Sequence, residues 1–372
     1  MQTFSHAHSP LPGWRDALKA CLAALGPVPG DARLGFLYAT DHHAAHLTDI
    51  LAECKAATGI GHWVGSVGMG IAATDREYLD EPGLALMLTD LPETQFRILP
   101  PLHNLADILK LDEELKVDGE PAYFGIVHGD PGNPLMGELI EHLAARTGTG
   151  FLVGGLTSAR DHPAQIADEV VGGGLSGVLL GSGVALATRL TQGVSPLGPR
   201  HMVTRGERNI VMALDGRPPL DVLREDIGET LFSQLERLGG YLFAGLPTQD
   251  TDTGDYLARN IVGIDPQSGY LAIGDYVEPG QSLMFCRRDS SSATEDMQRM
   301  LDGLKAALPG PIRGALYFSC LGRGSNMFGE GSAELKLISA SLGAIPLVGF
   351  YASGEISRDR LYGYTGVLTV FT

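Results

Sequence analysis

The segment Cys320-Leu-Gly-Arg-Gly-Ser325 combines residue types that can bind an anion. Gly322 and Gly324 allow backbone N–H groups to converge, and Arg323 can bind a carboxylate through two parallel hydrogen bonds. Cys320 ends an apolar run beside this arginine, where the pKa of a thiol can fall and make it nucleophilic. The alternative for Cys320 is a small buried hydrophobic residue. The segment predicts a loop that contacts an anionic ligand.

Three further segments follow apolar runs that the pattern identifies as strands. Glu355, which comes after such a run, could receive a substrate amine or pair with Arg323, or it could be an exposed turn carboxylate. His128-Gly-Asp130 and Asp41-His42 follow two other such runs, in positions equivalent to that of the Cys320 loop. We expect these loops to meet at the carboxyl ends of strands, where open α/β sheets bind ligands. The predicted ligand-binding residues are Cys320, Gly322, Arg323, Gly324, Glu355, His128, Asp130, Asp41 and His42.

Three histidines, His42, His43 and His46, gather at one strand-to-helix junction. Because His42 and His46 are four residues apart, they could face one way on a helix and hold a metal. Two imidazoles are half a metal site, and His43 stands where the H-E-x-x-H motif has its glutamate. A polar helix start is the simpler interpretation, so the sequence predicts neither a metal nor a cofactor.

The common nucleotide-binding and hydrolase motifs are either absent from the sequence or lie in the wrong structural context. No lysine follows a glycine, so the phosphate-binding G-x-x-x-x-G-K motif is absent, and no G-x-S-x-G motif of α/β-hydrolases occurs. The segment 172–177 matches G-x-G-x-x-G, but the residues after it predict a strand, whereas a dinucleotide site requires a helix N-terminus there.

Charge and composition exclude several classes of partner. The chain has 27 Lys and Arg against 44 Asp and Glu, a net charge of −17, which repels nucleic acid and anionic membrane surfaces. The uncharged stretch 170–188 is long enough to imitate a membrane span, but its glycines favour two strands that turn at Gly181-Ser-Gly183. No secretory signal pattern begins the chain. We therefore expect a cytoplasmic protein with no membrane insertion and no nucleic-acid partner.

A repeated pattern organises the chain: an apolar strand, a polar loop, an amphipathic helix, a strand that ends in Val-Gly, and one more apolar strand. The pattern predicts an α/β fold with α+β elements, in which mixed β-sheets are built from repeated β-α-β-β units covered by helices. The three first strands are Leu34–Ala39, Ala122–Val127 and Gly314–Ser319, and the three Val-Gly pairs are Val64-Gly65, Val153-Gly154 and Val348-Gly349.

Two modules are expected. The segment Pro196–Pro219 is rich in turn-forming and basic residues, which is typical of a boundary. We predict an N-terminal extension with a first helix over 1–30, one module over 31–205 and a second over 206–372.

Several motifs resemble the FIST family. Tyr317-Phe-Ser-Cys-Leu-Gly-Arg-Gly324 and Pro346–Ile356 are similar to its C-terminal module, as is the segment Asp255–Ile261. Val64-Gly65 and the glycine-rich 170–187 region are similar to its N-terminal module. The resemblance implies a sensory, ligand-binding protein that is not an enzyme, with an amino acid or other carboxylate metabolite as ligand and a separate signalling protein as partner.

Two other functions stay open at this level. One is a hydrolase or transferase that uses Cys320 or a metal held by His42 and His46. The other is a protein-interaction scaffold whose exposed loops recognise a partner.

Overall fold

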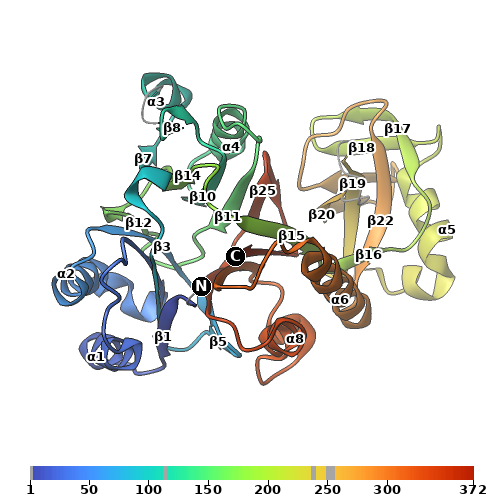
Figure 1. The fold of residues 1–372 in the computed structure, drawn as a ribbon. Helices are drawn as coiled ribbons and strands as arrows, with labels where there is room; N and C mark the ends of the chain where they lie inside the picture. The colour runs from blue at the N-terminus through green and yellow to red at the C-terminus, as the bar shows by residue number, and fades with distance from the viewer. Residues whose placement is uncertain (1–2, 112–114, 236–239, 249–255) are drawn as a thin grey trace. The chain divides into compact units, whose positions relative to one another are not determined.

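The computed structural model describes residues 3–111, 115–235, 240–248 and 256–372 (Figure 1). Its contacts divide the chain into two compact units. The larger unit joins Met1–Thr191 to Asp296–Thr372, and the smaller is Gln192–Glu295. Among the described residues, no helix combines the length and the apolar character that crossing a membrane requires.

Three six-stranded mixed sheets form the larger unit. The first contains, in spatial order, β1 (Ser5–Ser9), β6 (Leu84–Thr89), β2 (Leu34–Thr40), β3 (His62–Gly68), β12 (Gln165–Ala167) and β13 (Glu169–Val171). The second contains β26 (Arg360–Tyr362), β25 (Glu355–Arg358), β11 (Leu152–Leu156), β10 (Phe124–Gly129), β14 (Leu175–Leu180) and β7 (Phe96–Leu102). The third contains β15 (Leu186–Gln192), β27 (Thr365–Phe371), β23 (Gly314–Cys320), β24 (Leu347–Ala352), β4 (Gly70–Ala73) and β5 (Arg76–Leu79).

The same three-stranded core recurs in each sheet. The first strand of a unit (β2, β10 or β23) pairs in parallel with the strand after the helix (β3, β11 or β24). Its other edge pairs antiparallel with the last strand of the unit (β6, β14 or β27). The predicted repeat of β-α-β-β units in mixed sheets is therefore confirmed.

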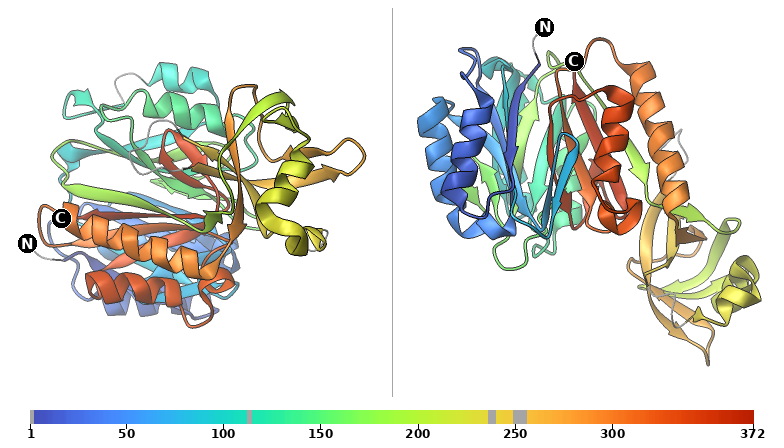
Figure 2. Two further views of the ribbon diagram at one scale, coloured as in Figure 1. Left: turned by 90° about the vertical axis from the view of Figure 1, so that its right-hand side faces the viewer. Right: turned by 90° about the horizontal axis from the view of Figure 1, so that it is seen from below.

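Helices cover the outside of these sheets (Figure 2). Each crossover from a first strand to its parallel neighbour contains a helix whose apolar side is buried, as expected for right-handed β-α-β connections. The helices of the larger unit are α1 (Trp14–Leu25), η1 (Asp41–His46), α2 (Leu47–Thr58), η2 (Glu93–Gln95), α3 (Leu105–Lys110), α4 (Met136–Ala144), α6 (Ser290–Ala307, which begins in the smaller unit), α7 (Ser325–Phe328) and α8 (Ala333–Leu342), and a small ladder joins β8 (Lys116–Val117) to β9 (Glu120–Pro121).

A cyclic exchange of strands interlocks the three sheets. β4 follows β3 along the chain but pairs with β24 of the third sheet. β12 follows β11 but pairs with β3 of the first sheet, and β25 follows β24 but pairs with β11 of the second. Each unit thus donates a strand to another, so no sheet is complete without a distant part of the chain.

The glycine of each Val-Gly pair lies where the parallel strands approach most closely. A Cβ added to any of the three would lie 1.7 or 1.8 Å from the carbonyl oxygen of the residue opposite, closer than any real contact. Only glycine fits there. The opposing pairs are Gly65 with Leu37, Gly154 with Val127, and Gly349 with Tyr317.

One aromatic cluster fills the centre of the larger unit. The residues after Leu37, Val127 and Tyr317 are Tyr38, His128 and Phe318, all fully buried. The Tyr38 ring lies 6.2 Å from that of Phe318, and its hydroxyl lies 3.1 Å from Nε2 of His128. Equivalent positions of the three units therefore meet in one core.

The glycine-rich 170–188 region contains the two strands that the sequence predicted, β14 and β15, with the turn between them near Gly181. The two strands do not pair with each other: β14 pairs with β10 and β7, whereas β15 pairs with β27. They form no hairpin, because each strand completes a sheet built by another part of the chain.

In its described residues, the smaller unit is a seven-stranded sheet on which helix α5 (Pro219–Phe232) packs. A further pairing of β22 with β19 joins strands from both ends of the sheet order. Two strands, β17 and β18, occupy most of the segment Pro196–Pro219, which the sequence indicated as a boundary between modules. The strands in spatial order are β16 (Val194–Pro196), β22 (Ser282–Arg288), β17 (His201–Glu207), β18 (Ile210–Leu214), β21 (Tyr270–Ile273), β20 (Tyr256–Asp265) and β19 (Leu242–Pro247).

Candidate functional site

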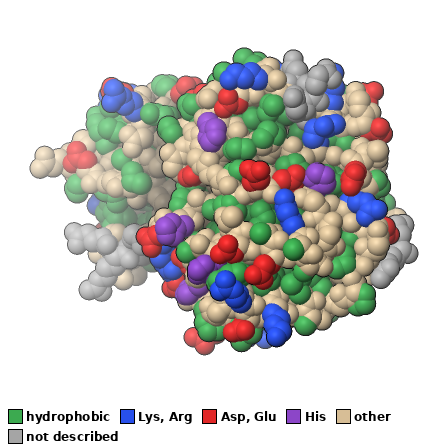
Figure 3. All heavy atoms as spheres, turned by 90° about the vertical axis from the view of Figure 1, so that its left-hand side faces the viewer, with side chains coloured by type: hydrophobic (Ala, Val, Ile, Leu, Met, Phe, Trp, Pro, Cys, Tyr) green, Lys and Arg blue, Asp and Glu red, His purple; other side chains and the backbone are tan. Residues whose placement is uncertain are grey.

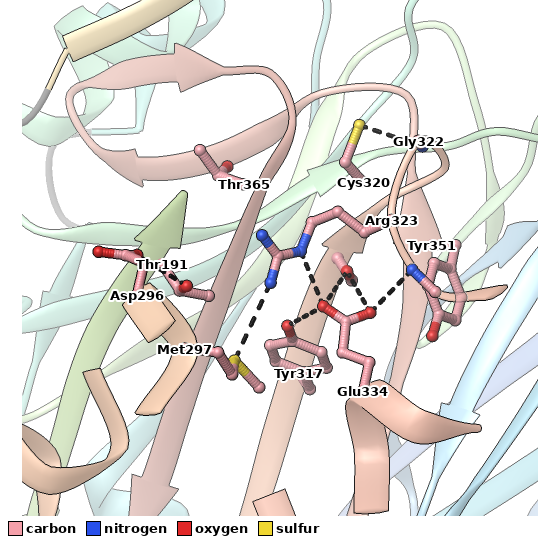
Figure 4. A network of polar contacts seen from close by, with 12 residues as sticks. Thr191, Asp296, Met297, Tyr317, Cys320, Gly322, Arg323, Glu334, Tyr351 and Thr365 are labelled. Carbon is pink, nitrogen blue, oxygen red and sulfur yellow. Dashed lines mark hydrogen bonds and ion pairs between the residues drawn. The ribbon is translucent and has the colours of Figure 1, made fainter. Parts of the chain in front are cut away.

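A buried carboxylate, Glu334, organises the loop after β23. It lies in the first turn of α8 and is fully buried. Its Oε1 accepts hydrogen bonds from the Tyr317 hydroxyl (2.7 Å) and Arg323 Nε (2.7 Å), and its Oε2 accepts one from the Gly324 N–H (2.9 Å) (Figure 4). The Ser319 hydroxyl lies 3.2 Å from both oxygens. One side chain thereby fixes the strand end, the loop and the arginine.

Arg323 is fully buried and ion-paired with Glu334. Although burial lowers the pKa of Arg323, the Glu334 carboxylate outweighs it and raises that pKa above its ordinary value. Nη2 lies 3.9 Å from the Met297 sulfur, and Nη1 donates to no described residue. A buried charged donor without a partner is costly in a folded protein, so Nη1 is a candidate contact for a ligand.

Glu355 begins β25 and is also fully buried. Its Oε2 accepts hydrogen bonds from the Thr365 N–H (3.1 Å) and hydroxyl (2.8 Å), whereas its Oε1 has no partner among the described residues. Burial raises the pKa of Glu355 to about 8, against the opposing effects of Thr365 and Arg323. The carboxyl is therefore mostly protonated at neutral pH, and a cation placed beside it would ionise it.

Cys320 lies beside these two groups. The thiol is partly buried, and its sulfur accepts a hydrogen bond from the Gly322 N–H at 3.4 Å. Burial raises the pKa of Cys320 well above its ordinary value, and Glu355 raises it further. Since the thiolate is the reactive species, this environment opposes nucleophilic catalysis.

His128, another predicted site residue, belongs to the core. It is fully buried between aromatic rings, and burial lowers its pKa to about 3. Its Nε2 is bonded to Tyr38, and its Nδ1 has no partner among the described residues. In this position it fills the centre of the molecule.

The acidic residues Asp130 and Asp41, which were also predicted, form hydrogen bonds or ion pairs with residues outside this site. Asp130 accepts N–H groups of Gly132 and Gly173 (both 2.8 Å), which holds together the loops that flank β10. Asp41 pairs with Arg160 at 2.8 Å and with the half-exposed ring of His42 at 3.4 Å. The structure thus brings Cys320, Arg323 and Glu355 together, while the other carboxylates have partners elsewhere.

The histidine cluster is dispersed. His43 is buried, and the His46 ring stacks on Trp14 with centroids 5.5 Å apart. Within the described ranges, no group of three or more His, Cys, Asp or Glu side chains could hold a metal ion. Acidic, basic and histidine side chains mix on the face shown in Figure 3.

Sequence reasoning missed Glu334 as a functional residue. The signal was a carboxylate on the side of α8 that also carries the buried Leu335 and Ile338. An acidic residue among buried positions requires a partner, and the nearby Arg323 is the obvious one.

The fold and this site define a class: an α/β protein in which buried charged side chains converge at strand-end loops. Residues 33–217 match the FIST N domain and residues 219–358 match the FIST C domain. The chain belongs to the FIST family, whose domains are sensory domains of signal transduction. Asp255, the first residue of one motif that carried the resemblance, lies outside the described residues.

Two curated relatives cover nearly the whole chain. An uncharacterized protein of Mycobacterium tuberculosis is 31% identical over 354 residues, 92% of each chain. An uncharacterized protein of Mycobacterium bovis is 28% identical over 385 residues, 96% of each chain. The similarity extends over both domains.

Proposed function

We propose that this protein is a sensor for a small metabolite that carries a carboxylate and an amino group, such as an amino acid. One observation supports this most directly: Arg323 and Glu355 are fully buried, and each has one polar atom with no hydrogen-bond partner among the described residues. Buried polar groups are almost always satisfied, so two such atoms in one loop cluster favour a ligand that satisfies both.

The two groups suit the two ends of such a ligand. Nη1 of Arg323 would donate to the carboxylate, as a charge-assisted hydrogen bond. Glu355 would ionise and accept the ammonium group, since a cation within about 4–6 Å favours the charged form of a carboxyl group. Cys320 and Gly322 would line the site. The N–H of Gly324 already donates to Glu334, so its part is to hold Arg323 in position.

The signal would pass to a separate partner protein. Arg323 follows β23 and is held by Glu334 of α8, and Glu355 begins β25, the strand exchanged into the second sheet. A ligand that bridges them would bias the relative position of these elements, which a partner could recognise.

A thermal-shift screen of amino acids and organic acids tests the proposal. We expect at least one of them to raise the melting temperature of the wild type, and Glu355→Gln to reduce that shift. Glu138→Gln, an exposed substitution of the same kind on α4, should leave it unchanged. The proposal is wrong if no compound stabilises the wild type, or if Glu355→Gln responds like Glu138→Gln.

A further inference from the structure

A histidine in the smaller unit is held between two aspartates. His201 is the first residue of β17, and its side chain is 11% exposed. Its Nδ1 lies 2.7 Å from Oδ2 of Asp215, in the turn after β18. Its Nε2 lies 3.0 Å from Oδ2 of Asp226 on α5. The ring therefore connects a strand, a turn and a helix.

Both contacts require a protonated ring. An ionised carboxylate only accepts hydrogen bonds, and a neutral imidazole has one N–H and one acceptor nitrogen. The imidazolium donates from both nitrogens, so it alone satisfies both aspartates. After loss of its proton, one nitrogen lone pair would face a carboxylate at hydrogen-bond distance, which is repulsive.

The surrounding charges favour the imidazolium. From α5, Asp226 faces the ring, and Glu225 lies farther away in a bidentate pair with Arg217. From the turn, Asp215 faces it, and Arg217 acts on that carboxylate from outside. From β22 two uncharged residues approach: Leu283 is the cross-strand partner of His201, and the Phe285 ring lies with its centroid 6.4 Å from that of His201. Partial burial lowers the pKa of His201, but the two aspartates outweigh it and raise that pKa above its ordinary value.

The two aspartates differ in whether water can replace the hydrogen bond that each forms with His201. The Asp226 side chain is 8% exposed, so water cannot replace its hydrogen bond. The Asp215 side chain is 48% exposed and can turn to solvent. Asp215 also has a φ of 51°, a left-handed conformation that aspartate and asparagine adopt more readily than other non-glycine residues, and its Oδ1 accepts the Met202 N–H at 2.9 Å. The bond to His201 is thus one of the contacts that hold this turn.

We propose that His201 is a proton-operated latch on the Asp215-Gly216 turn that leads into α5. Protonated His201 holds both aspartates. When the proton is lost, the neutral ring keeps Nε2–H on the buried Asp226 and releases Asp215, so the turn opens as pH rises. This device is independent of the proposed ligand site.

Histidine-selective NMR of the full chain tests the latch. We expect His201 to titrate above about pH 6.5, the value of a free histidine, and its neutral form to carry the proton on Nε2. Asp215→Asn should lower the pKa of His201, because it removes a charge, while asparagine still tolerates positive φ and can accept the Met202 N–H. A His201 that titrates at or below about 6.5, or is unaffected by Asp215→Asn, would overturn the proposal.

Amide hydrogen exchange of residues 214–227 provides the structural readout. After correction for intrinsic exchange, we expect protection in wild type to fall by about threefold or more as pH rises through the His201 titration, in accord with a local opening. His201→Gln cannot change its charge, so its protection should not follow pH. If protection in wild type is as independent of pH as in His201→Gln, no latch exists.

Discussion

At the scale of single residues, Glu334 determines what Arg323 can do. The carboxylate accepts hydrogen bonds from Nε of Arg323, from the hydroxyls of Tyr317 and Ser319, and from the Gly324 N–H. The guanidinium is therefore fixed in position, and its Nη1 has no hydrogen-bond partner among the described residues. A buried ion pair is by itself weak support for stability, because both charges lose their hydration. Its value here is orientation: Arg323 is held in place before any ligand arrives, which lowers the entropy cost of binding.

Removal of the Glu334 charge should destabilise the larger unit strongly. In Glu334→Gln, Arg323 becomes a buried cation without a counter-ion, which typically costs about 3–5 kcal/mol. Urea unfolding of both proteins measures this difference. Glu138→Gln should change the free energy of unfolding by less than about 0.5 kcal/mol. A loss below about 1 kcal/mol in Glu334→Gln would mean that water or another group already compensates Arg323.

At the scale of elements, the three Val-Gly strands carry the fold. Each glycine lets a parallel strand lie against the carbonyl oxygen of its neighbour, and the three sites are equivalent. The three units are therefore structural repeats with the same steric requirement at the same position. This requirement also makes strand pairing sensitive to a single methyl group.

Alanine at one of these positions should disrupt its sheet. A Cβ at residue 65, 154 or 349 would lie 1.7 or 1.8 Å from a backbone oxygen, which no rotamer change can relieve. We expect each substitution to cost more than about 3 kcal/mol or to prevent folding. Gly137→Ala is the matched control, because no heavy atom lies within 4 Å of its added Cβ and alanine favours the helix. Circular dichroism and urea midpoints give the comparison, and Gly154→Ala as stable as Gly137→Ala would refute the packing argument.

Local patterns in the sequence predicted the elements but not all their partners. Apolar runs and Val-Gly pairs predicted the β-α-β-β units, because strand burial and close approach leave local signals. The exchange of β4, β12 and β25 has no such signal, since pairing across sheets depends on the whole core. For that reason the sequence indicated the two strands on either side of Gly181 but not that they belong to different sheets. At the site, the ligand-binding role of the Cys320–Ser325 loop and Glu355 stays a prediction, whereas the Arg323–Glu334 pair requires knowledge of which face of α8 is buried.

At the scale of the whole molecule, two sets of buried titratable groups have opposite effects on how the free energy of unfolding depends on pH. Burial lowers the pKa of His43 to about 4 and that of His128 to about 3, so the folded protein keeps both neutral. The unfolded chain protonates them below about pH 6.5. Glu355, with its pKa raised to about 8, and His201, with a raised pKa, hold protons that the unfolded chain releases at lower pH.

Stability should therefore be greatest near neutral pH. Below about pH 6.5 the two histidines outnumber Glu355, so the unfolded state binds more protons and acidification destabilises the fold. Above that pH the folded state holds more protons, so stability falls as pH rises through the titrations of His201 and Glu355. Urea midpoints measured from pH 5 to 9 should pass through a maximum. Glu355→Gln should flatten the alkaline side and steepen the acid side, because Glu355 offsets part of the histidine effect below about pH 6.5. A midpoint that rises steadily to pH 9 would contradict this prediction.

The central claim is that Arg323 and Glu355 together bind a small ligand. Isothermal titration calorimetry at pH 7 with the compound that stabilises the wild type most tests it directly, with wild type, Glu355→Gln and Glu138→Gln measured side by side. Loss of a charge-assisted hydrogen bond costs about 1.5–3 kcal/mol, so we predict that Glu355→Gln weakens binding by about tenfold or more. Glu138→Gln should match the wild type. Equal affinity of Glu355→Gln and wild type would contradict the assignment of this site.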